Sequence, residues 1–176
     1  MVDISKAWSV QGWMIESELK WLAEQASKCE IICEVGAWLG RTTRALADNT
    51  AGIVYSVDTW EGSAEHQEML KDKPKDWLFS QFVHNTADLT NLYAVRKTSV
   101  EAAKELHDLR FHLIFLDASH TYEDVKADIL AWRPLLAKGG ILCGHDYGPS
   151  WPGVMKAVDE LVPNRKIEVN EIWSYR

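Results

Sequence analysis

The stretch IICEVGAWLGRTTRALA, residues 31–47, joins an apolar run to a helix-like segment through a turn that contains Gly36 and Gly40. The apolar run at 31–35 has the length and composition of a buried strand. Glycines at such a turn let the backbone come close to a ligand at the carboxyl end of the strand. The stretch is therefore typical of the first strand–turn–helix unit of a parallel α/β sheet.

Further apolar runs alternate with segments of helical period, at residues 52–57, 92–97, 112–116 and 140–144. This alternation indicates a parallel sheet covered by helices on both faces. The tail RKIEVNEIWSYR, 165–176, alternates apolar and polar residues around Asn170 and predicts a hairpin. We expect an α/β fold with a doubly wound, Rossmann-like, seven-stranded and mostly parallel sheet that ends in an antiparallel hairpin.

The chain of 176 residues has the size of one ordinary domain. We expect a single domain over 1–176, with an N-terminal helical segment at 1–28 and an insertion at 61–90 that covers the sheet edge. Thr121 and Asp124 match a capping box, which starts a helix. We expect Pro134 and the KGG sequence at 138–140 to close that helix.

The composition of the chain indicates which classes of molecule it binds. Hydrophobic residues make up 47% and charged residues 26% of the chain, as in globular proteins. A net charge of -7 without a basic cluster disfavours nucleic acid. We find no run near the ~18 apolar residues of a membrane span and no secretory leader pattern. We therefore expect a cytoplasmic protein with a small-molecule substrate.

The first candidate site is E-x-G-x-x-x-G, formed by Glu34, Gly36 and Gly40. It differs from G-x-G-x-x-G, so a dinucleotide fits less well than a ligand without phosphate. Asp58 ends the second predicted strand, where an acid can accept hydrogen bonds from both ribose hydroxyls. The pattern indicates a nucleoside.

The second candidate site lies where two strands end, at Asp117 and at His145 with Asp146. If these parallel strands are neighbours ~4.8 Å apart, their terminal side chains converge. Two carboxylates and a histidine beside a nucleoside site favour a hard cation. Mg²⁺ is the first expectation, with Mn²⁺ or Fe²⁺ as alternatives because of His145.

Taken together, these motifs resemble the class I S-adenosylmethionine-dependent methyltransferases. D-x-x-H-x-Y at 117–122 and G-H-D-Y at 144–147 are similar to the group with the macrolide sugar O-methyltransferases and cephalosporin-hydroxylase-like proteins. The resemblance covers about residues 30–175, and His145 stands where that group carries Asp or Glu. It implies S-adenosylmethionine as cofactor, a metal at Asp117, His145 and Asp146, catalysis by His120 and Asp117, and a cofactor site formed by Glu34, Gly36, Ala37, Gly40, Thr42, Asp58, Thr59, Ser99 and Asp117.

The resemblance implies O-methylation of a hydroxyl on a sugar, polyol or phenol, with His120 as general base. One alternative is a non-heme iron oxygenase that uses His120, His145 and an Asp. Another is a non-catalytic nucleoside-binding domain. The same residues also fit purely structural roles, with Asp117 and Asp146 capping loops. A neighbouring subunit that completes the pocket would make the protein a homo-oligomer.

Overall fold

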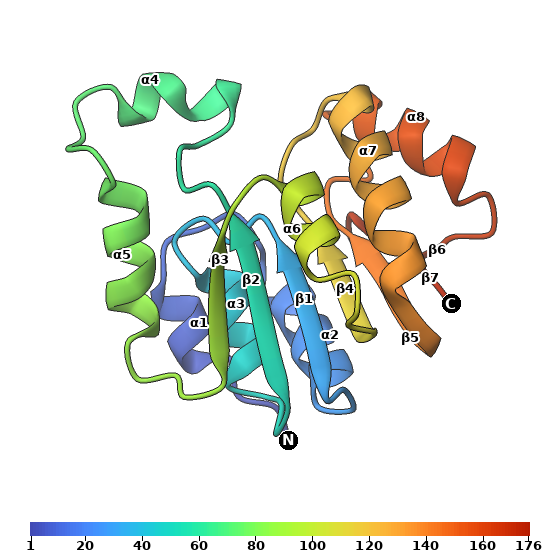
Figure 1. Ribbon diagram of the computed structural model, residues 1–176, viewed down its shortest axis with the longest axis horizontal. Coiled ribbons are helices and arrows are strands. Elements are labelled where there is room, and N and C mark those ends of the chain that lie inside the picture. Colours follow the sequence, from blue (N-terminus) through green and yellow to red (C-terminus); the bar gives the residue numbers. More distant parts are fainter.

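The computed structural model describes residues 1–176 and contains a seven-stranded sheet with the order β3-β2-β1-β4-β5-β7-β6 (Figure 1). Strands β1 to β5 are parallel, whereas β7 is antiparallel to both β5 and β6. The predicted mostly parallel sheet with a C-terminal antiparallel hairpin is confirmed. The strands are β1 (Ile31–Val35), β2 (Ile53–Asp58), β3 (Leu92–Arg96), β4 (Phe111–Leu116), β5 (Leu136–Gly144), β6 (Lys166–Val169) and β7 (Ile172–Tyr175).

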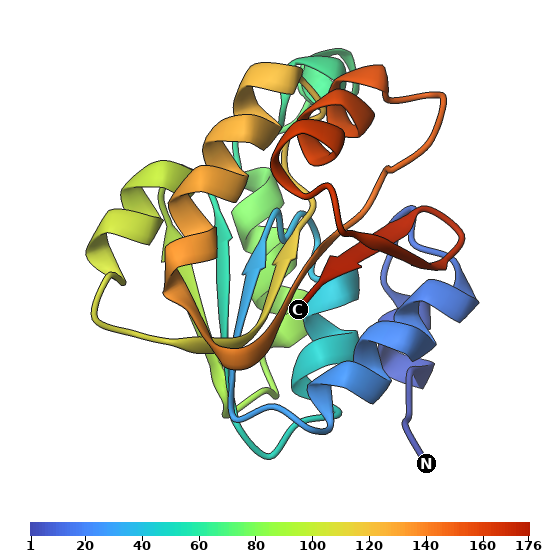
Figure 2. The same ribbon diagram turned by 90° about the vertical axis from the view of Figure 1, so that its right-hand side faces the viewer.

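Helices cover both faces of this sheet, as Figures 1 and 2 show. Side chains of α1, α2 and α3 pack on one face, and side chains of α6, α7 and α8 pack on the other. The 61–90 segment supplies α4 and α5, and α5 packs on a separate apolar cluster around Trp60. The helices are α1 (Ser5–Ser9), α2 (Glu16–Ala26), α3 (Arg41–Ala47), α4 (Gln67–Leu70), α5 (Trp77–Thr86), α6 (Ser99–Glu105), α7 (Tyr122–Trp132) and α8 (Pro152–Leu161), with short 3₁₀ turns at Ala64–His66 and Arg133–Leu135.

Strand β1 shows how a central strand of this sheet is buried on both faces. Successive side chains of a strand point to opposite faces. Ile32 accordingly packs with the α2 and α3 cluster, whereas Cys33 and Val35 pack with the α7 and α8 cluster. Burial on both faces explains why β1 is apolar except for Glu34.

One predicted boundary is wrong. The expected closure of the helix by KGG at 138–140 does not occur, because α7 ends at Trp132 and a 3₁₀ turn leads directly into β5. The KGG sequence lies inside β5, where the register with β4 shifts between Phe111 and Leu113. The predicted start of the helix is confirmed, since the Thr121 side chain accepts a hydrogen bond from the Asp124 amide.

The strand order places a binding crevice at a defined point. Chain order reverses between β1 and β4, and ligands of open α/β sheets bind outside the carboxyl ends of strands at such a point. The glycine loop passes very close to the backbone at the end of β4, because a Cβ added at Gly36 would lie 2.0 Å from the carbonyl oxygen of Asp117. Gly36 also has a φ of +95°, which disfavours other residues.

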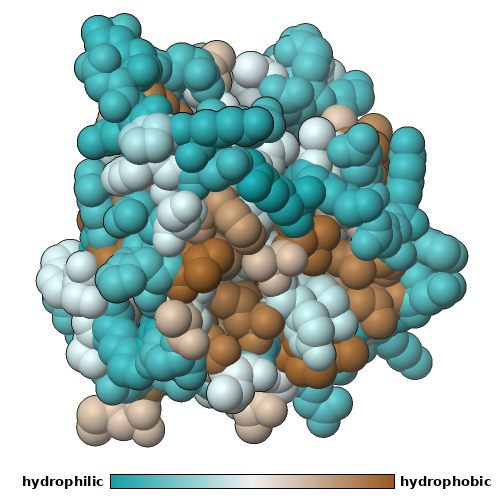
Figure 3. All heavy atoms as spheres, turned by 60° about the vertical axis from the view of Figure 1, so that its left-hand side comes forward, coloured by the Kyte–Doolittle hydropathy of each residue, from teal (hydrophilic) through white to brown (hydrophobic).

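The outer surface mixes polar and apolar side chains. On the face in Figure 3, hydrophobic side chains gather centrally among hydrophilic surroundings. None of the helices has the length and apolar character that a membrane crossing requires.

Replacing Gly36 with alanine should destabilise the protein severely, because the new Cβ would meet the Asp117 backbone. Gly139 provides a matched control, since its φ is +78° but no atom lies within 4 Å of an added Cβ. We expect Gly36→Ala to lower the free energy of unfolding by at least about 2 kcal/mol more than Gly139→Ala does. Urea unfolding measures both, and equal losses would contradict this account of the turn.

Candidate active site

The carboxyl ends of the strands surround a cavity of about 550 Å³, which is within the usual range for small-molecule sites. Its wall combines the glycine loop, the ends of β2, β4 and β5, and parts of the N-terminal and 61–90 segments. Of the predicted cofactor residues, seven line this cavity: Gly36, Ala37, Thr42, Asp58, Thr59, Ser99 and Asp117.

Glu34 and Gly40 are the two predicted cofactor residues that do not line the cavity. Glu34 is fully buried beneath the loop, where its Oε2 accepts hydrogen bonds from Thr43 Oγ1 at 2.5 Å and Ser56 Oγ at 2.6 Å. Burial raises the pKa of Glu34 to about 8. Gly40, with a φ of +91°, begins α3 beside Phe82 and Thr86. Both residues shape the loop from outside the cavity.

Asp58 ties the glycine loop to the end of β2. Its Oδ2 accepts hydrogen bonds from the amides of Ala37 and Trp38, both at 2.9 Å, and its Oδ1 accepts one from Trp60 at 2.7 Å. Burial raises the pKa of Asp58, against these amides, which lower it. Because a carboxylate offers about four lone pairs, Asp58 can hold the loop and still accept bonds from a ligand.

Across the cavity, the structure brings together the polar residues at the ends of β4 and β5. The ligating atoms of Asp117, His120 and Asp146 lie within 4.8 Å of one another. His120 Nε2 is 2.8 Å from Asp146 Oδ2. His145 Nδ1 lies 3.3 Å from Asp146 Oδ1 and 3.8 Å from Asp117 Oδ1. The predicted convergence of these side chains is therefore present.

Two carboxylates that sequence reasoning missed hold the other nitrogens of the two imidazoles. Glu65 Oε1 lies 2.7 Å from His120 Nδ1, and Glu18 Oε1 lies 3.0 Å from His145 Nε2. Glu18 left one readable signal, because it interrupts the apolar side of α2 beside Leu19 and Leu22. Glu65 left none, since it lies in a polar segment without a strand or a periodic helix.

Neighbouring charges shift the pKa values of the residues in this cluster. Burial alone would lower the pKa of His145, but hydrogen bonds to Asp146 and Glu18 and the charge of Asp117 raise it to about 11. The pKa of His120 is also raised, because Asp146 and Glu65 outweigh the effect of its burial. Burial raises the pKa of Asp117 to about 7, against the charge of His145, which lowers it. The negative charges of the carboxylates therefore favour positive charge at this place in the cavity.

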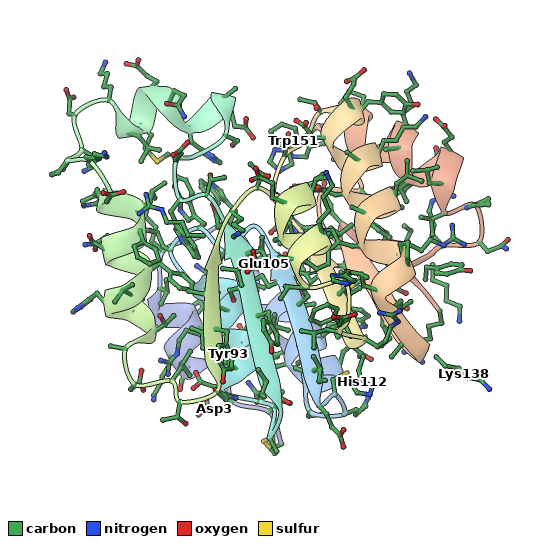
Figure 4. The ribbon with its side chains drawn as sticks, viewed as in Figure 1. Asp3, Tyr93, Glu105, His112, Lys138 and Trp151 are labelled. Carbon is green, nitrogen blue, oxygen red and sulfur yellow. The ribbon has the colours of Figure 1, made fainter.

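Aromatic rings border two sides of the cavity. Trp151 stacks on His120 with ring centroids 3.9 Å apart, and Figure 4 places it above the strands beside the start of α7. On the other side, Trp13 and Trp38 each pack against His66, with centroids 5.0 and 4.4 Å apart. These rings come from three segments, since Trp13 lies in the N-terminal segment, His66 in the 61–90 insertion and Trp151 in the loop after β5.

The remaining histidines lie outside the cavity lining. His112 is at the opposite end of the sheet (Figure 4), where its Nδ1 accepts a hydrogen bond from the Ile31 amide. His84 and His107 are exposed. His66 is the exception, since it lines the cavity.

Comparison with known proteins places the chain in a family. A family model described as a methyltransferase domain matches residues 33–147, which include the ends of β1, β2, β4 and β5. An uncharacterised protein, y4gI, of Sinorhizobium fredii (strain NBRC 101917 / NGR234) is 31% identical over 100 residues. That match covers 57% of this chain and only 11% of the relative, so the chain spans a small part of its length.

Solved structures share the fold at low sequence identity. The calicheamicin methyltransferase CalS11 is 19% identical with a TM-score of 0.66, covering 91% of this chain and 77% of that one. An O-methyltransferase from Bacillus cereus, solved with S-adenosylhomocysteine (SAH), is 14% identical with a TM-score of 0.63, covering 92% and 81%. The family match over 33–147 confirms the resemblance predicted from the motifs, and the chain belongs to the methyltransferase domain family.

Proposed function

We propose that this protein transfers a methyl group from S-adenosylmethionine to a hydroxyl of a small molecule. The observation that carries the proposal is a single cavity with the Asp58-tethered glycine loop on one wall and the Asp117–His120–Asp146 cluster on another. A methyl donor and a group that removes a proton would thus face each other across one space. Membership of the methyltransferase family agrees with a methyl donor on one wall of the cavity and a base on the other.

The glycine loop and Asp58 form the proposed cofactor side. When bound there, S-adenosylmethionine supplies the methyl group on a sulfonium sulfur. Gly36 keeps the loop free of a side chain, and the Asp58 carboxylate fixes the loop amides. These residues hold the donor wall rigid, and holding donor and acceptor in line is most of what a methyl transfer requires.

His120 is the proposed general base, and Glu65 orients it. A neutral imidazole that donates Nδ1–H to Glu65 presents the lone pair of Nε2 to the cavity. Nε2 now lies 2.8 Å from Asp146 Oδ2, a contact that holds a proton between the two atoms, so this proton must leave the imidazole before Nε2 accepts one from a hydroxyl. The stacked ring of Trp151 restricts the imidazole to one plane. Glu65 would then stabilise the imidazolium that forms, as an acid does for many catalytic histidines.

The cluster also fits a divalent cation. Two carboxylates and imidazole nitrogens converge within a few ångströms, and the carboxylates demand positive charge. Asp117 and Asp146 would be its ligands, with a histidine beside them. When bound, such an ion would lower the pKa of a coordinated hydroxyl.

A sugar, a polyol or a phenol fits the proposed acceptor side. Aromatic side chains beside His120 suit a ring whose faces are apolar and whose edge carries hydroxyls. The iron oxygenase alternative would leave the glycine loop and Asp58 without a ligand. A non-catalytic domain would not need the Glu65–His120 pair. Methyl transfer therefore explains the arrangement of residues better than either alternative does.

Asp58→Ala should weaken binding of SAH by at least about 10-fold, because a hydrogen bond to a charged group is worth ~1.5–3 kcal/mol. Isothermal titration calorimetry measures this. Asp108→Ala, at a fully exposed side chain in the α6–β4 loop, is the matched control and should bind as the wild type does. Failure of the wild type to bind either S-adenosylmethionine or SAH would refute the proposed function.

His120→Ala should lower kcat by about 10²- to 10⁴-fold, which is the usual contribution of general-base catalysis. The readout is SAH release in the presence of a panel of sugars, polyols and phenols. The exposed His84 gives the control His84→Ala, which should retain wild-type turnover. Full turnover by His120→Ala would remove His120 from the mechanism.

The pH profile tests the Glu65–His120 pair. Because Asp146 and Glu65 raise the pKa of His120 above its ordinary 6.5, kcat/KM should rise with pH only above that value. Glu65→Gln removes one of the charges that raise this pKa, so the rising limb should move to lower pH. A limb that stays in place, measured between about pH 5 and pH 9, would show that Glu65 does not act on the base.

A further inference from the structure

Glu18 is a buried carboxylate in a helix outside the sheet. Its residue exposure is 1%, and it lies on the apolar face of α2. Its Oε2 accepts a hydrogen bond from the Ile15 amide at 2.9 Å. Its Oε1 accepts one from Asn170 Nδ2 at 2.7 Å and faces His145 Nε2 at 3.0 Å. The carboxylate is thus held by α2, by the β6–β7 turn and by the end of β5.

This contact decides which edge of the His145 ring faces the cavity. With Nε2 on Glu18, only Nδ1 remains, and it points at Asp117 Oδ1 and Asp146 Oδ1, 3.8 and 3.3 Å away. The backbone contributes as well, because Asp146 has a φ of +60° in the left-handed region. That turn brings the side chains of two consecutive residues to one point.

The arrangement matches a common pattern of metal sites. A histidine that ligates a metal almost always donates its other N–H to a carboxylate or carbonyl, which fixes the ring and its tautomer. Mg²⁺ prefers oxygen ligands, whereas imidazole nitrogen suits transition metals. We propose that Glu18 positions His145 Nδ1 as a nitrogen ligand beside Asp117 and Asp146, so that the site binds Mn²⁺ in preference to Mg²⁺.

The inference rests on the proposed function for its biological meaning but is tested without cofactor or substrate. The competing role for Glu18 is a structural tie between α2 and the end of β5. A structural tie predicts lower stability and no change in the choice of metal. Replacing Glu18 with glutamine keeps the size and a hydrogen-bond acceptor while removing the charge, so it separates the two roles.

The experiment titrates metal-free protein with MnCl₂, followed by the electron paramagnetic resonance signal of free Mn²⁺, and with MgCl₂ as competitor. We expect the wild type to bind Mn²⁺ at least about 10-fold more tightly than Mg²⁺, and Glu18→Gln to weaken Mn²⁺ binding by about 10- to 100-fold. Glu16→Gln is the matched control, because Glu16 is in the same helix but pairs only with Lys20 on the surface. Equal affinities for the two metals, or an unchanged Glu18→Gln, would overturn the inference.

A second variant keeps the inference testable if Glu18→Gln fails to fold. His145→Asp replaces the nitrogen ligand with oxygen, and we expect it to reduce the preference for Mn²⁺ over Mg²⁺. Nitrogen coupling to bound Mn²⁺, seen by pulsed resonance, should disappear in His145→Asp and persist in His120→Ala. The opposite result would make His120 the nitrogen ligand and overturn the inference.

The metal preference and the proposed function can be refuted independently of each other. Metal-free protein that binds SAH but does not prefer Mn²⁺ would overturn this inference and leave the proposed function in place. Protein that prefers Mn²⁺ but binds no SAH would refute the proposed function and leave the Glu18–His145 arrangement in place.

Discussion

Negative charge that is buried at the ends of β4 and β5 is the constraint on which the rest of the structure depends. The acids Asp117, Asp146 and Glu18, together with the more exposed Glu65, surround only two imidazoles. A buried charge is costly unless it is paired and hydrogen-bonded. The sheet supplies two of these acids, and the helix α2 and the 61–90 segment supply the others. These acids bring segments that are far apart in the chain to one place. Their negative charge is balanced there by positive charge, either as protons on the imidazoles or as a cation.

The opposite wall of the cavity is formed by backbone that one carboxylate, Asp58, holds in place. The glycine loop crosses the Asp117 backbone too closely for any side chain at Gly36, and Asp58 fixes its amides. One wall thus suits a ligand held by shape and a few hydrogen bonds, while the other suits groups that exchange protons. A methyltransferase needs this separation, because its donor must be held still while the acceptor loses a proton.

Much of the fold was readable from the sequence, because strands that are buried on both faces are continuously apolar and end in turns with glycines or acids. The same logic located Asp58, Asp117, His120, His145 and Asp146. It failed for the KGG sequence, which does not close a helix but lies within β5 where the register with β4 shifts, with Gly139 at a φ of +78°. It also failed for Glu65 and Glu18, since these contacts depend on how distant segments pack on the sheet. Glu34 and Gly40, two members of the predicted motif, lie outside the cavity lining, and Glu34 is hydrogen-bonded beneath the loop.

In the proposed mechanism, a methyl donor and a hydroxyl acceptor occupy opposite walls of one cavity, and a crystal structure of the protein with SAH tests this arrangement most directly. We expect the ribose near Asp58, the sulfur directed across the cavity toward Asp117 and His120, and the space beside Trp151 free for an acceptor. A nucleoside bound away from the glycine loop, or a sulfur directed away from His120, would contradict the account.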